Sequence, residues 1–132
     1  MSSKMKLPSE STQELDALSS SLRLRRNIIC RMALGISLSD EEPPEIEELD
    51  SNGQEFNKPT ILGTDEQVVY ALVTQHFGQR IDPDEFFSTY VRAEIIRGLD
   101  ILSSEYRRIN SPVSFMRMLC GMEGELSLEQ HR

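Results

Sequence analysis

Aromatic residues, cysteine and histidine are scarce in this sequence. Its 132 residues include no tryptophan, three tyrosines, five phenylalanines, two histidines and two cysteines. A core must therefore be built mainly from leucine, isoleucine, valine and methionine. Cys30 and Cys120 are far apart and lack metal-ligand spacing, so we expect neither a zinc site nor a disulfide scaffold. We interpret both as small buried hydrophobic residues.

Long hydrophobic runs are also absent. No apolar run approaches the roughly 18 residues of a membrane span, and the first ten residues lack the apolar core of a secretory signal. We therefore expect a cytoplasmic protein with no membrane partner. A composition of 38% hydrophobic and 27% charged residues is ordinary for a soluble chain. It predicts one domain over 1–121, followed by a disordered tail over 122–132.

The sequence motifs of common enzymes are missing as well. There is no H-E-x-x-H, no G-x-x-x-x-G-K-[ST] and no G-x-G-x-x-G. His76 lies in a predicted helix beside Phe77, His131 lies in the tail, and neither suggests a pair with a serine or cysteine nucleophile. The carboxylates fall in the first turns of helices or in one acidic loop, where capping and solvation explain them. We expect no catalytic residue, no metal and no cofactor, and hence not an enzyme.

Charge is unevenly distributed along the chain. The net charge of −8 argues by itself against a nucleic-acid partner. Residues 1–39, however, hold six basic and three acidic residues, a balance of +3, whereas residues 40–50 hold seven acids and no base. One short segment therefore supplies most of the negative charge, and the total says little about any single face.

The N-terminal third predicts a strand and two helices. Residues 2–7 form a strand or a disordered arm, and Lys4 and Lys6 point the same way if the arm is extended. A first helix over 10–21 follows, capped by Ser9. A second helix, over 27–38 with Asn27 as its N-cap, is apolar on nearly every side.

Four arginines lie in or just before the predicted second helix. Arg23, Arg25 and Arg26 precede it, and Arg31 lies among its apolar residues. A buried guanidinium needs a partner, because an unpaired buried charge is very costly. We expect Arg31 to form an ion pair with Glu55.

The segment over 39–51 predicts an acidic loop, because Pro43-Pro44 bars a helix. Three interpretations stay open. The loop is a solvated connector, it repels DNA from one side of the protein, or it offers an acidic patch to a protein partner. Asn52-Gly53 then suggests a tight turn, as in a small hairpin.

Helical patterns dominate the rest of the chain. A third helix is capped by Thr64 and ends at Gly78, and a fourth opens at Asp82-Pro83. Gly98 inside the fourth helix predicts close packing. A short last helix runs from Ser111-Pro112 to Gly121. Together the patterns predict a mainly α fold, a compact domain of four to five helices with a short N-terminal strand, a ribbon-helix-helix-like start and an oligomeric core.

Two segments have a distinctive order of residues. The first is Asn27 to Ala33 (NIICRMA) with Ser37-Leu38, and the second, after the prolines of the acidic loop, is Gly53 to Gly63 (GQEFNKPTILG). Together they resemble the DNA sulfur modification protein DndE family. Weaker similarity, including Arg97-Gly98, continues through the later helices. The E-F-N-x-x-T element is the specific part, because helix patterning does not generate such a loop motif.

The resemblance implies a role in the bacterial system that replaces a non-bridging phosphate oxygen of DNA with sulfur, the modification half of a restriction-modification system. It implies a non-catalytic, DNA-binding accessory subunit that prefers nicked duplex. The implied partners are DNA, other modification subunits and further copies of the chain, with a tetramer expected. The candidate DNA contacts are Arg23, Arg25, Arg26, Lys4 and Lys6.

Two other classes of function compete with this one, and one possible role of a cysteine would add to it. A strand followed by two helices is also typical of ribbon-helix-helix transcriptional regulators, in which paired strands enter a DNA groove. A protein adaptor that docks through its acidic loop is the third function class. Within a sulfur pathway Cys30 could carry a persulfide, but its apolar neighbours Ile29 and Met32 favour a packed thiol.

Overall fold

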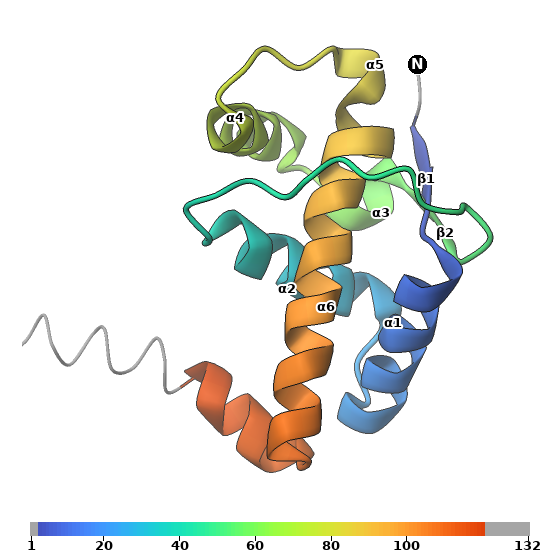
Figure 1. Cartoon of the computed structure of the whole chain (residues 1–132), viewed down its shortest axis with the longest axis vertical. Helices are drawn as coiled ribbons and strands as arrows, with labels where there is room; N and C mark the ends of the chain where they lie inside the picture. Colours follow the sequence, from blue (N-terminus) through green and yellow to red (C-terminus); the bar gives the residue numbers. More distant parts are fainter. Residues whose placement is uncertain (1–2, 121–132) are drawn as a thin grey trace, which may run out of the picture.

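The structure is a computed structural model that describes residues 3–120, and its central element is a long helix over residues 83–109 (Figure 1). The predicted tail over 122–132 lies outside the described residues. The elements in chain order are β1 (Lys4–Lys6), α1 (Ser9–Leu22), α2 (Arg26–Leu38), β2 (Glu55–Asn57), α3 (Lys58–Leu62), α4 (Glu66–Phe77), α5 (Pro83–Glu85), η1 (Phe86–Val91) and α6 (Arg92–Ile109). A last helix covers 112–120. The mainly α fold with a short N-terminal strand is confirmed.

The long helix runs without interruption from α5 through η1 into α6. It begins as predicted, with the carboxylate of Asp82 accepting a hydrogen bond of 2.9 Å from the backbone N–H of Asp84. The segment η1 is a π-helix, whose wider turn lets the consecutive residues Phe86 and Phe87 both reach the core. The same face continues with Val91, Ile95, Leu99 and Leu102, all of which are buried.

The helix α2 crosses α6 at a very close contact. A Cβ atom built on Gly98 would lie 1.9 Å from the carbonyl oxygen of Ala33, so only glycine fits there. The predicted close packing at Gly98 is confirmed. In α2, Ile29, Cys30 and Ala33 are fully buried within this chain, so much of the helix's apolar surface is already covered without a second subunit.

The two short strands form an antiparallel pair in which Met5 lies opposite Phe56. Both of these side chains are buried, whereas Lys4 and Lys6 are exposed on the other face. The predicted strand is therefore confirmed. The predicted small hairpin at Asn52-Gly53 is wrong, because β2 pairs with the N-terminal strand instead of with a neighbouring one.

Several helix ends differ from the sequence predictions. Ser9 lies inside the first turn of α1 instead of capping it, and α2 begins at Arg26 with Arg25, not Asn27, at its N-cap. The N-cap of α4 is Asp65 instead of Thr64. The predicted end at Gly78 is confirmed, since this glycine has a left-handed backbone with φ 67°. Serine, threonine and asparagine favour caps in general, but distant groups can satisfy the same backbone donors.

Asp50 supplies the missing cap of α1 from a distance of 41 residues. Its carboxylate accepts hydrogen bonds from the backbone N–H of Ser9 at 2.9 Å and from the Ser9 hydroxyl at 2.7 Å. These two hydrogen bonds hold the pKa of Asp50 below its usual value. The long loop is thereby tied to the start of α1. Among the described residues, no helix is long and apolar enough to cross a membrane.

Candidate functional site

The three arginines Arg23, Arg25 and Arg26 lie together where α1 is connected to α2, and Arg26 is the first residue of α2. We call this region the arginine turn. All three are exposed. Arg23 ends α1 in a left-handed backbone conformation with φ 56°. The hydroxyl of Ser19 donates a hydrogen bond of 2.6 Å to the carbonyl oxygen of Leu24, which fixes the path of the turn.

The three arginines of this turn are not equivalent. Arg26 forms an ion pair with Asp16, with 2.6 Å between Nε and Oδ1, and both side chains are about half exposed. Within residues 3–120, Arg23 and Arg25 form no ion pair. The structure therefore leaves two guanidinium groups, instead of three, fully available to an external anion.

The structure does not bring Lys4 and Lys6 to the arginine turn. The lysines precede α1 and the arginines follow it, and a helix of 14 residues separates its ends by about 21 Å. The lysine strand also pairs with β2 of its own chain, whereas a ribbon-helix-helix protein needs that edge for the strand of a second subunit. This pairing counts against the regulator interpretation.

The predicted ion pair between Arg31 and Glu55 is wrong. The Nε and Nη2 atoms of Arg31 donate hydrogen bonds to the backbone carbonyls of Ile61 at 2.8 Å and Thr60 at 3.0 Å. Carbonyl groups near the end of α3 lack partners within that short helix, so they attract a cation. Glu55 is exposed on the ribbon, in register with Lys6. The E-F-N-x-x-T element thus forms β2 and the part of α3 that holds Arg31.

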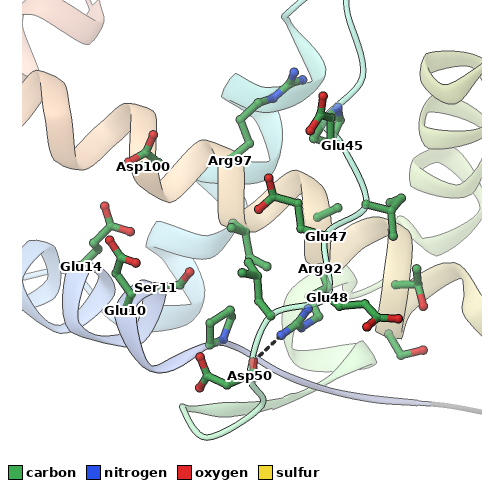
Figure 2. A pocket seen from close by; sticks show the side chains of 18 of the residues that line it. Glu10, Ser11, Glu14, Glu45, Glu47, Glu48, Asp50, Arg92, Arg97 and Asp100 are labelled. Atoms are coloured by element: carbon green, nitrogen blue, oxygen red, sulfur yellow. Dashed lines mark hydrogen bonds between the residues drawn. The ribbon is translucent and has the colours of Figure 1, made fainter.

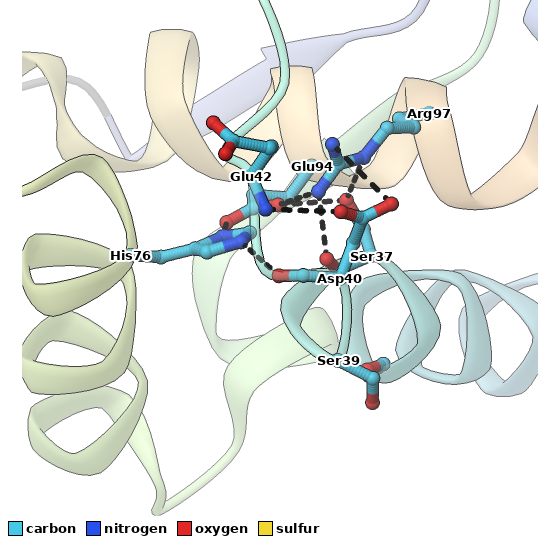
Figure 3. Close-up of polar contacts among 8 residues, drawn as sticks. Ser37, Ser39, Asp40, Glu42, His76, Glu94 and Arg97 are labelled. Atoms are coloured by element: carbon cyan, nitrogen blue, oxygen red, sulfur yellow. Dashed lines mark hydrogen bonds and ion pairs between the residues drawn. The ribbon is translucent and has the colours of Figure 1, made fainter.

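A cluster that the sequence analysis did not predict lies where α2, α4 and α6 meet (Figure 3). We call it the buried polar corner, and its members are Ser37, Asp40, His76, Glu94 and Arg97. Glu94 is fully buried, and its two carboxylate oxygens lie 2.7 Å from the hydroxyl of Ser37 and 2.5 Å from Nδ1 of His76. Arg97 donates hydrogen bonds to the hydroxyl and the carbonyl oxygen of Ser37, at 2.9 and 2.7 Å.

The groups of this corner that could act in catalysis, the imidazole of His76 and the hydroxyl of Ser37, are already hydrogen-bonded within the protein. The second ring nitrogen of His76, Nε2, lies 2.7 Å from the carbonyl oxygen of Asp40, which can only accept, so Nε2 carries a proton. The hydroxyl of Ser37 points to Glu94 and not to the imidazole, which leaves no serine and base pair. The buried polar corner therefore fits a structural role that joins three helices to the start of the acidic loop.

The sulfur and metal chemistry available here is limited. Cys30 is fully buried, and burial raises the pKa of its thiol to about 12. Because the thiolate is the form that reacts with sulfur donors, this environment favours a packed thiol over a persulfide carrier. Cys120 is exposed, so the expected burial of that cysteine is wrong. Within residues 3–120, no three His, Cys, Asp or Glu side chains converge on a possible metal position.

The acidic loop over 39–51 is held at both ends by α6. At its start, Arg97 binds Ser37 and lies 4.0 Å from the carboxylate of Asp40. At its end, Arg92 donates a hydrogen bond of 2.7 Å to the carbonyl oxygen of Asp50 (Figure 2). It donates a second, also of 2.7 Å, to the carbonyl oxygen of Lys6. Between these points the chain crosses α6 as an extended segment (Figure 1). A freely solvated connector does not describe this arrangement.

The helices packed around α6, the two-stranded ribbon and the exposed arginine turn together define a small helical domain with the fold of DndE proteins. A crystal structure of DndE from Escherichia coli B7A, described as involved in DNA phosphorothioation modification, shares this fold with a TM-score of 0.62 and 20% identity. The match covers 77% of this chain and 97% of that chain. A glycine-to-lysine mutant of DndE, involved in DNA phosphorothioation, gives a TM-score of 0.61 at 20% identity and covers 79% and 99%.

The family model of the DNA sulphur modification protein DndE matches residues 4–110, and the chain belongs to this family. The resemblance noted in the sequence is thereby confirmed. A comparison with curated proteins gives no match. Family membership connects the chain to DNA sulphur modification, and the role of each residue has to be inferred from the site.

Proposed function

We propose that this protein is a non-catalytic accessory subunit of DNA phosphorothioate modification that binds the backbone of duplex DNA through its arginine turn. The observation that carries the proposal is the exposure of Arg23 and Arg25 without an ion pair within residues 3–120. Arg26, partly neutralised by Asp16, and the lysines Lys4 and Lys6 at the other end of α1 act as secondary contacts. The partners are DNA and the other modification subunits, and the site of action is the cytoplasm.

The backbone conformation of Arg23 supports this proposal. A left-handed conformation at a helix end is normally taken by glycine or asparagine, and Asn110 follows this rule at the end of α6 with φ 57°. At Arg23 the same conformation holds an arginine, at a cost of about 1 kcal/mol relative to glycine. Glycine would relieve this strain but would remove a cationic side chain from the turn. Such local strain is typical of positions that serve a function.

The proposed contact recognises phosphates more than bases. The arginines lie on a turn between two helices whose apolar faces pack against α6, so neither helix is free to enter a groove with its whole length. Guanidinium groups bind phosphate oxygens with high affinity and little dependence on sequence. A nick makes a duplex easier to bend onto a protein surface, which would explain a preference for nicked DNA.

Self-association would enlarge this cationic surface. The helix α4 exposes Val68 and Leu72, with 61% and 46% of their surface accessible. Val69 of the same helix lines a groove of about 440 Å³ together with Gly35 and Leu38 of α2. We propose that this apolar face joins copies of the chain into a homo-oligomer, expected to be a tetramer. Symmetry would then repeat the arginine turn along a bound duplex.

Fluorescence anisotropy on intact and nicked duplexes, at two salt concentrations, tests the proposal. The double variant Arg23→Ala/Arg25→Ala should bind about tenfold more weakly and should reduce the slope of log affinity against log salt by about 2 for each bound subunit. The matched control, Arg80→Ala/Arg117→Ala, removes the same charge from exposed arginines of other elements. It should change the affinity by less than about twofold. Binding that ignores both the salt and the arginine turn would overturn the proposal.

A further inference from the structure

A large groove lies between the acidic loop, α1 and α6 (Figure 2). It has a volume of about 910 Å³. Its walls carry seven carboxylates and two guanidinium groups, a formal charge of −5. Both guanidinium groups, those of Arg92 and Arg97, are already hydrogen-bonded to the protein. The negative charge of this acidic groove is therefore largely uncompensated.

Apolar surface accompanies the charge. Ile46 and Leu49 on the acidic loop are 49% and 41% exposed, and both line the groove. Pro43, Pro44 and Ile96 contribute further apolar lining. A loop that only kept the protein soluble would not need to expose two large aliphatic side chains at the groove. The combination favours a ligand that has both cationic and apolar groups.

The backbone of the acidic loop has free hydrogen-bonding groups where it lines the groove. From Pro43 to Leu49 no backbone N–H or C=O group has a hydrogen-bond partner within residues 3–120. Arg92 holds the carbonyl oxygen of Asp50 just after this extended segment, and Arg97 lies 4.0 Å from the carboxylate of Asp40 shortly before it. It therefore offers an edge along which a second extended chain can pair, at little cost in ordering the loop.

Electrostatics inside the groove favours a cation. The pKa of Glu14 is raised, first by burial and then by the nearby carboxylates of Asp100 and Glu10. An arriving lysine or arginine side chain would relieve this repulsion. The phosphates of DNA would instead be repelled, so this face is separate in function from the arginine turn.

We propose that the acidic groove is the docking site for an extended, basic segment of a partner protein, in which lysine or arginine alternates with aliphatic residues. The segment lies along Pro43 to Leu49, its cations meet the carboxylates of both walls, and its aliphatic side chains cover Ile46 and Leu49. The inference rests on the accessory role proposed above, since an accessory subunit must contact another subunit. It uses residues that the DNA contact does not use.

A titration of the full chain with a labelled peptide tests this docking site. The probe is an eight-residue peptide of alternating arginine and valine, blocked at both ends. The control probes are the same peptide methylated at alternate backbone nitrogens and an oligolysine of equal charge. The test variant is Glu47→Lys/Glu48→Lys, and the matched control is Glu41→Lys/Glu42→Lys. The control makes the same charge change on the same loop, at exposed residues that do not line the groove.

The proposal predicts a tenfold or greater loss of peptide affinity for Glu47→Lys/Glu48→Lys and at most a twofold to threefold loss for the control variant. Ile46→Ser/Leu49→Ser should lower the affinity about fivefold while leaving its salt dependence unchanged. Both control probes should bind at least fivefold more weakly than the alternating peptide. Circular dichroism and thermal unfolding, expected to be unchanged, establish that each variant is folded.

Three results would overturn the docking proposal. Equal losses for both charge variants, or equal binding of oligolysine, would show a general attraction of cations to an acidic loop. A change of subunit number in the Glu47→Lys/Glu48→Lys variant, measured by analytical ultracentrifugation, would show that a second copy of the chain occupies the groove. The proposed DNA contact is tested independently of the docking site. The variant Arg23→Ala/Arg25→Ala should weaken DNA binding and leave the affinity for the peptide within twofold of the wild-type value.

Discussion

The buried polar corner and the arginine turn both contain arginine and an acidic neighbour, yet the protein uses them differently. In the corner, Glu94 is completely inaccessible and its carboxylate is hydrogen-bonded on both oxygens. In the turn, Arg26 and Asp16 form an ion pair in which both side chains are about half exposed. The carboxylate of Glu94 is excluded from water, whereas the ion pair of Arg26 and Asp16 remains in contact with water.

This contrast separates groups that hold the fold from groups that can serve a ligand. A buried carboxylate that loses its hydrogen-bond partners is stabilised neither by water nor by the protein, so the buried groups of Glu94, Ser37 and His76 depend on one another. An exposed ion pair contributes about 0.2–1 kcal/mol, because water and salt replace it easily. Substitutions should therefore destabilise the fold when made at the buried groups of the corner and change only binding when made in the turn.

The largest effect is expected from Glu94→Ala. The substitution leaves Ser37 and His76 without their buried hydrogen-bond partner and removes the carboxylate that lies 3.6 Å from the guanidinium of Arg97. The free energy of unfolding should fall by about 3–5 kcal/mol. Urea denaturation followed by circular dichroism measures this loss.

Glu105→Ala is the matched control for that substitution. It lies on the same helix and breaks an exposed ion pair with Arg108, so it should lower the free energy of unfolding by less than about 1 kcal/mol. If the two variants had equal stability, the corner would be as dispensable as a surface pair, and the contrast drawn here would be wrong.

A somewhat smaller effect is expected at the crossing of α2 and α6. Gly98→Ala places a methyl group 1.9 Å from the backbone oxygen of Ala33, which forces the helices apart. The cost should be about 2–3 kcal/mol, which exceeds the gain of about 1 kcal/mol in helix propensity.

Gly35→Ala is the matched control for Gly98→Ala, because it makes the same substitution in α2 at a position with free space. Its new methyl group would meet no atom within 4 Å, so the variant should be about 0.5–1 kcal/mol more stable than the wild type. Thermal unfolding at one fixed protein concentration compares the two. Stabilisation by both substitutions would show that the helices can separate at little cost.

Local patterns in the sequence were enough to predict much of the fold. The start of the long helix at Asp82, the end of α4 at Gly78 and the close contact at Gly98 each depend on a residue's own backbone preference. Such preferences are set within a few residues and can be read directly. The helices themselves followed from apolar periodicity.

Contacts between distant segments could not be predicted in this way. Asp50 caps α1 from 41 residues away, and Arg31 binds carbonyl groups of α3 instead of a carboxylate. In the first case a distant side chain takes the place of the expected local cap, and in the second the backbone takes the place of the expected carboxylate. Such partners carry no signature in the sequence.

The sequence does contain one indication of the buried polar corner. Glu94 lies three residues after Val91 and four before Gly98, which places an acid on the buried face of α6. An acid on an otherwise apolar face indicates a buried partner, but the pattern does not say which one. Only the packing of α2 and α4 against α6 reveals Ser37 and His76.

The acidic groove is intermediate between the buried polar corner, where charges are compensated, and the arginine turn, where they are open to water. Glu14→Gln tests this description, and its effect should be the smallest of those predicted. Glu14 has a raised pKa in the folded protein, so the folded state holds its proton more tightly than the unfolded state does. Such a group lowers stability as the pH rises from the unfolded pKa of roughly 4.3 through the folded pKa. Removing the carboxylate should increase the free energy of unfolding at pH 7 by up to about 0.5 kcal/mol and change nothing at pH values below roughly 4.

Urea unfolding between pH 4 and pH 8 measures this gain, and Glu10→Gln is the control. Glu10 is exposed in the first turn of α1, where the helix dipole favours an acid. This favourable interaction offsets the repulsion between Glu10 and Glu14, so the removal of the Glu10 charge should not stabilise the protein. A loss of stability for Glu14→Gln at pH 7 would mean that Arg107 and Ser103 already compensate this carboxylate. The acidic groove would then resemble the satisfied corner more than the open turn, and a cationic partner would gain less by entering it.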